Sequence, residues 1–124
     1  MLLIDANAIL RYALNDNVDM AIKVRDLIAK SKVFVRHEVL AEVVYVLSKV
    51  YLLPRKEIAE GINTFFSHPN VETEAEEVAI LALKTYANTN LDFVDCLLYA
   101  FSDAYGYDVF TFDKKLNSMM GNAN

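Results

Sequence analysis

Four acidic residues, spread along the chain, have types and spacing that suggest chemistry: Asp5, Glu42, Asp95 and Asp113. Carboxylates gathered at one place repel one another strongly, so such a cluster requires a divalent cation. Oxygen ligands alone favour Mg²⁺ or Mn²⁺ over Zn²⁺. A centre of this kind typically hydrolyses phosphodiester bonds, because the metal activates water and offsets charge on phosphorus.

Each acid also has a simpler structural explanation. Asp5 precedes a predicted helix, and Asp113 could cap a helix that follows its strand, because Asp is a common N-cap residue. Asp92 and Asp95 lie three residues apart at the start of another helix and resemble a capping box. Glu42 resists this explanation because it falls within the apolar stripe of its helix, unless it sits at the stripe's edge and reaches solvent.

The pattern of the chain predicts alternating strands and helices. Short apolar runs predict strands over 1–4, 32–35, 70–73 and 108–111, the first of them buried, and helical periodicity predicts helices over 6–14, 18–30, 38–51, 54–66, 74–87 and 92–105. Such alternation indicates an α/β fold, with one parallel sheet covered on both faces in a single domain over residues 1–124. Because ligands bind beyond the carboxyl ends of parallel strands, Asp5 and Asp113 are expected at the same rim.

The composition limits the classes of function. Apolar residues make up 55% of the 124 residues, yet no run approaches the roughly 20 residues of a membrane-spanning helix. The single cysteine, Cys96, is consistent with a reducing cytoplasm, where we expect the protein. The net charge of −5 argues against nucleic-acid binding unless part of it belongs to a metal site.

The acids lie in four motifs that resemble a known family. LLIDANAILRY, LAEVVYVL, LDFVDCLLYA and VFTFDKKL are similar, in this order, to motifs of the PIN-domain ribonucleases, particularly the VapC-type toxins of toxin–antitoxin pairs. The resemblance implies a three-layer α/β/α sandwich whose parallel sheet has four to five strands in the order 3-2-1-4-5. It also implies an RNA substrate, Mg²⁺ or Mn²⁺, a homodimer and an antitoxin partner.

The resemblance further assigns roles to residues. It implies metal ligands at Asp5, Asp95 and Asp113, with Glu42 near the attacking water or as a further acid, and Asp92 as an outer member. Polar neighbours could support these acids or contact RNA phosphates: Asn7 and Thr111 for the former, Arg11, Lys114 and Lys115 for the latter.

Two other functions are compatible with parts of the pattern. A haloacid-dehalogenase-type phosphatase also has an Asp after its first strand, but it needs a second acid two positions later, where this chain has Asn7. A PIN-like domain retained for RNA binding or protein interaction, with little catalysis, is the other alternative. The two histidines, His37 and His68, are isolated and do not suggest zinc.

Overall fold

The computed structural model describes residues 1–122, and the last two residues of the expected domain lie outside this range. Strands and helices alternate along the described chain in the following order: β1 (Leu2–Leu3), α1 (Ala6–Leu14), α2 (Val18–Lys30), β2 (Val33–Val35), α3 (His37–Lys49), α4 (Arg55–Phe66), β3 (Val71–Thr73), α5 (Glu76–Asn88), α6 (Phe93–Tyr105) and α7 (Lys114–Met119).

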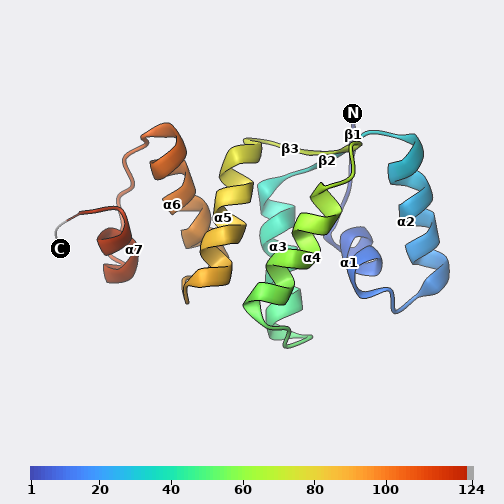
Figure 1. Ribbon diagram of the computed structural model, residues 1–124, viewed down its shortest axis with the longest axis horizontal. Helices are drawn as coiled ribbons and strands as arrows, with labels where there is room; N and C mark the ends of the chain where they lie inside the picture. The colour runs from blue at the N-terminus through green and yellow to red at the C-terminus, as the bar shows by residue number, and fades with distance from the viewer. Residues whose placement is uncertain (123–124) are drawn as a thin grey trace.

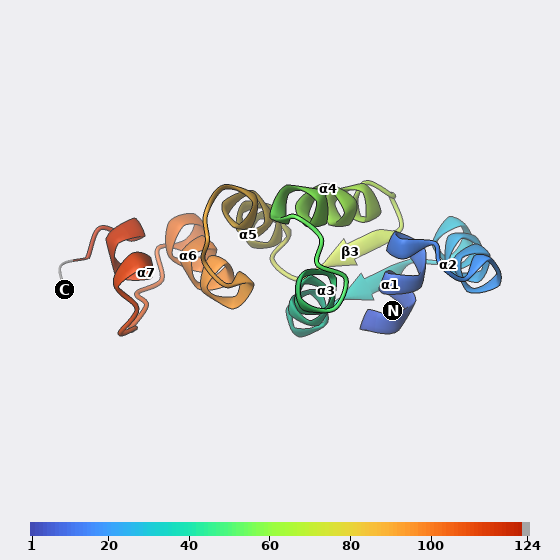
Figure 2. The same ribbon diagram turned by 90° about the horizontal axis from the view of Figure 1, so that it is seen from below.

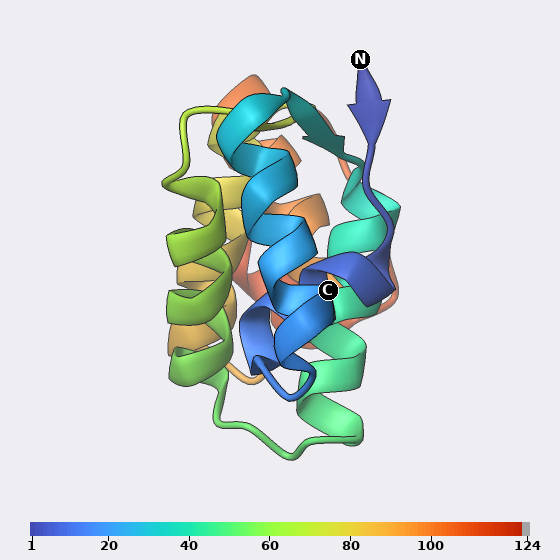
Figure 3. The same cartoon turned by 90° about the vertical axis from the view of Figure 1, so that its right-hand side faces the viewer.

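The three strands form a parallel sheet in the order β1-β2-β3. Leu2 of β1 lies beside Val33 of β2, and Val33 lies beside Val71 of β3. One further hydrogen bond, from the Ile4 N–H to the Phe34 carbonyl at 3.2 Å, extends the pairing beyond β1. Figure 3 shows β1 at the margin of the sheet, next to the N-terminus.

Helices cover both faces of this small sheet. Figure 2 shows α4 and α5 on one side of β2 and β3, and α1 and α3 on the other. Large side chains that are almost fully buried join these layers into one core: Ile9, Leu40, Ile58, Ile62, Phe65 and Leu83. The arrangement confirms the α/β class that the sequence predicts.

The molecule is elongated, with α6 and α7 at one end and α1 and α2 toward the other (Figure 1). The helix α6 packs mainly against α5, and α7 packs against α6. No helix within residues 1–122 is long and apolar enough to cross a bilayer.

Two predictions about strands are corrected by the structure. The first strand is not buried as expected, because Leu2 and Leu3 are exposed and only Ile4 reaches the core. The predicted strand over 108–111 joins no ladder, because it lies between α6 and α7, away from β1 (Figure 1). The sheet within the described residues therefore has three strands, and the expected four to five are not reached in one chain.

Candidate active site

Two of the four acids, Asp95 and Asp113, line one pocket together with Asp92. Asp92, Asp95 and Asp113 surround a space of about 300 Å³ between the start of α6 and the start of α7, with Lys114 and Lys115 at its border. Burial raises the pKa of the Asp95 carboxyl, and the negative charges of Asp113 and Asp92 raise it further. The pocket therefore disfavours a third negative charge unless a cation compensates it.

The local sequence explains how these side chains are placed. Asp113 caps α7, because its Oδ1 accepts a hydrogen bond from the Leu116 N–H at 2.8 Å, and the Thr111 hydroxyl accepts one from the Asp113 N–H at 3.0 Å. Asp92 holds the N-cap position of α6 without a capping hydrogen bond to its side chain. The capping explanation thus applies to Asp113, while the predicted capping box of Asp92 and Asp95 does not form.

An arginine from the middle of the chain fixes the segment that leads into the pocket. Arg55 of α4 donates from Nε to the Tyr86 carbonyl at 2.8 Å and from Nη2 to the Leu91 carbonyl. Its guanidinium also lies 3.7 Å from the centre of the Tyr86 ring, a cation–π contact. Nearby, burial raises the pKa of the Cys96 thiol to about 11, which keeps this cysteine protonated and unreactive.

A second pocket, of about 490 Å³, adjoins Asp92 and Asp95 on the side of α3. Tyr45 and Lys49 line this second pocket together with Arg55. Asp92 and Asp95 therefore have Lys49 and Arg55 on one side and the two lysines of α7 on the other. Tyr45, Lys49 and Arg55 were not predicted from the sequence as part of the site. The signal that could have found the first two is the spacing of four between Tyr45 and Lys49, which places both on one helix face.

Asp5 is not part of this acidic pocket. It caps α1, since the Ala8 N–H donates to its Oδ1 at 2.9 Å, and both Asp5 and Asn7 are exposed. The helix α1 lies well away from α7 along the long axis in Figures 1 and 2. Within residues 1–122 no three histidine, cysteine or acidic side chains are close enough to hold a metal ion, so a single chain does not gather the predicted set.

Glu42 does not occupy the inward face that its spacing suggested. The buried stripe of α3 consists of Leu40, Val43, Val44 and Leu47. At about 100° per residue, Glu42 falls on nearly the opposite side of the helix from the centre of this stripe. Its side chain is exposed, as the simpler explanation at the sequence level allowed.

The cations expected to contact phosphates differ in availability. The Arg11 guanidinium pairs with Asp16, with Nη1 2.9 Å from Oδ2, and lies on α1 away from the pocket. Lys114 and Lys115 are exposed beside the acids. Of the three predicted cations, only the two lysines adjoin the pocket.

A comparison with protein families matches residues 2–121 to the PIN domain. The chain belongs to the PIN domain family. Neither a curated protein nor a solved structure matches the chain. PIN domains are generally nucleases, and membership therefore supports a nuclease at this level and suggests RNA binding.

PIN domains usually use divalent metal ions, and the acidic pocket can be tested against this expectation. Its oxygen donors are those that Mg²⁺ and Mn²⁺ prefer, and the raised pKa of Asp95 is what a cation would lower. The donor chemistry therefore fits such an ion. The geometry within one chain is incomplete, because Asp5 lies apart.

Proposed function

We propose that this PIN domain is a cytoplasmic, Mg²⁺- or Mn²⁺-dependent endoribonuclease and the toxin of a toxin–antitoxin pair. The observation that carries the proposal is the acidic pocket, where Asp95 and Asp113 face a common space at a cost in electrostatic repulsion. An arrangement of this kind is poor for stability, which favours a functional reason for it.

In this proposal Asp5, Asp95 and Asp113 would hold the metal, and the metal would activate the attacking water and stabilise negative charge on the phosphate. Asp92 would orient the metal's water shell from the edge of the pocket, and Glu42 would act as a further acid near that water. Asn7 and Thr111 would support the ligands Asp5 and Asp113.

The substrate would lie across the pocket along its positive borders. Lys114 and Lys115 are suitably placed to neutralise RNA phosphates on one side of the acids. Lys49 is suited to the same task on the other side, where Tyr45 offers an exposed ring for base stacking. Arg11 contributes little in this arrangement, because Asp16 already neutralises it.

An RNA-binding or interaction domain with little catalysis is the alternative, favoured by the separation of Asp5 from the pocket. The experiment that decides is cleavage of total RNA in Mg²⁺ or Mn²⁺, compared with EDTA and with Asp95→Asn. We expect cleavage to require metal and to fall by about 10²-fold or more in the variant. Growth arrest on expression without an antitoxin, absent for Asp95→Asn, is the matching result in cells.

Asp103→Asn is the matched control, because it makes the same change at an exposed position of the same helix. It should leave cleavage within about twofold of the natural protein. RNA binding without cleavage would favour the interaction domain. Cleavage that persists in EDTA, or in Asp95→Asn, would contradict the metal-dependent mechanism.

A further inference from the structure

The strand β1 has one open edge and exposes apolar side chains. Among the described residues β1 pairs only with β2. Leu2 is 45% exposed and Leu3 is 64% exposed, although both belong to the sheet around which the core is built. An open, apolar edge of this kind presents unpaired N–H and C=O groups to any strand that fits them.

A second segment exposes apolar side chains and has no sheet partner. Residues 108–112, which we call the C-terminal extended segment, have no assigned strand or helix. Phe110 is 88% exposed and Phe112 is 89% exposed, with the two rings packed against each other 5.3 Å apart. A Val-Phe-Thr-Phe run is typical of a strand that is covered on both faces of a parallel sheet.

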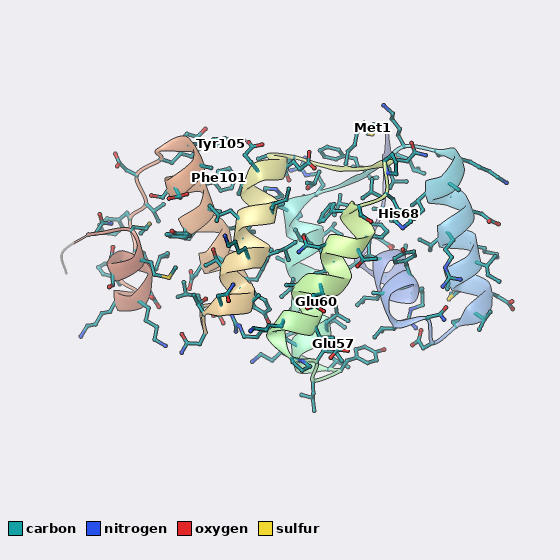
Figure 4. The ribbon with its side chains drawn as sticks, in the orientation of Figure 1. Met1, Glu57, Glu60, His68, Phe101 and Tyr105 are labelled. Carbon is teal, nitrogen blue, oxygen red and sulfur yellow. The ribbon has the colours of Figure 1, made fainter. Side chains whose placement is uncertain are left out.

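The C-terminal extended segment is held away from the β1 of its own chain. Its start is anchored by Tyr107, whose ring stacks on Phe101 of α6 at 5.9 Å, and α6 itself packs on α5. Arg55 fixes the chain just before α6 by its hydrogen bond to Leu91. Figure 4 accordingly shows Phe101 and Met1 on different sides of the molecule.

We propose that two copies of the chain exchange their C-terminal extended segments. Residues 108–112 of each copy would pair with the open edge of β1 in the other copy and become the fourth strand of its sheet. The same contact is made twice about a two-fold axis, so both open edges and both exposed segments are satisfied in one closed dimer. The dimer contact uses only the open edge of β1 and residues 108–112 of each copy.

The exchange would also complete the acidic site, a point that rests on the function proposed above. In a parallel pair the carboxyl ends of the strands meet at one edge, so Asp5 would lie beside the partner's Asp113. Asp95, which shares a pocket with Asp113 in the structure, would accompany it. Each site would then combine Asp5 of one copy with two acids of the other.

The exchange is tested by disulfide formation between separately tagged, co-expressed chains in a Cys96→Ala background. One chain carries Leu3→Cys and the other Thr111→Cys, the register that aligns Asp5 with Asp113. We expect a mixed disulfide at least about tenfold more abundant than with Ile80→Cys, an exposed control on α5. Light scattering should give a dimer for the natural chain.

Three results would overturn the exchange. One is a disulfide formed only within a chain that carries both cysteines, which would mean that the segment closes on its own β1. Another is a monomer at micromolar concentration, which would leave the edge open to a different protein. The last is a dimer that survives Phe112→Ser as well as it survives the surface control Ile80→Ser.

A second measurement separates the exchange from the nuclease proposal. Co-expressed Asp5→Asn and Asp95→Asn chains would form mixed dimers in which one of the two sites has all its acids. Cleavage should return to about one quarter of the natural level, whereas sites built within single chains would stay inactive. If the cysteine variants form the mixed disulfide but the natural chain never cleaves RNA, the function is refuted and the exchange stays intact.

Discussion

The region from β1 to α5 and the region from α6 to α7 differ in the exposure of their phenylalanine side chains. The first buries large side chains such as Phe65 between two helical layers and a sheet. The second leaves Phe110 and Phe112 almost fully exposed and holds a pocket of like charges. The first region therefore supplies most of the folding free energy, while the second carries exposed side chains and charges that act only when another molecule binds there.

Removing a large side chain from each region tests this comparison with the largest expected effect. Phe65→Ala should lower the free energy of unfolding by about 3–5 kcal/mol, because it opens a cavity in the core. Phe112→Ala should change the free energy of unfolding of the monomer by less than about 0.5 kcal/mol, because the side chain is exposed. Urea unfolding of dilute protein measures both, and a comparable loss from the two changes would end the contrast between the regions.

Arg55→Lys tests how the two regions are joined. Lysine keeps the positive charge but cannot donate to the carbonyls of Tyr86 and Leu91 with the same planar geometry. We expect a loss of about 1–3 kcal/mol in the free energy of unfolding, together with faster hydrogen exchange at the start of α6. Lys56→Arg is the control, because it substitutes the exposed residue that follows Arg55, and it should show neither change.

Asp95→Asn tests the charged pocket with the smallest expected effect. The pKa of Asp95 is raised above its ordinary value of 3.8 in the folded state, so its stabilising contribution is complete below that value and lost as pH rises through the folded pKa. In EDTA, Asp95→Asn should therefore become more stable than the natural protein as the pH rises toward 7. Urea unfolding from pH 3 to pH 7 measures the difference in stability between the two proteins. A difference that is the same at pH 3 and at pH 7 would contradict this prediction.

Most of the fold could be predicted because local periodicity determines most of its elements. The helices expected over 6–14 and 18–30 have those bounds in the structure, and the others agree within about two residues. The strands predicted over 32–35 and 70–73 are present over 33–35 and 71–73. The strand over 108–111 was wrong for one chain because strand formation depends on a neighbour, which the residues of the segment cannot specify.

The candidate site was predictable only in part. Asp95 and Asp113 were named from their motifs, and the structure brings them together with Asp92. Asp5 was expected beside them because both strands were assumed to belong to the same sheet. The inward position of Glu42 was wrong because apolar residues lie on more than one side of α3. The sequence alone did not show that Leu40, Val43, Val44 and Leu47 form the buried face.

The separation of Asp5 from Asp113 along the long axis has a consequence for how activity would depend on dose. A site that needs acids from both chains exists only in the dimer. Below the dissociation constant of the dimer, the concentration of such sites therefore follows the square of the chain concentration. Halving the number of chains then leaves about a quarter of the sites. An enzyme assembled in this way would be nearly silent at low copy number and would switch on steeply as chains accumulate.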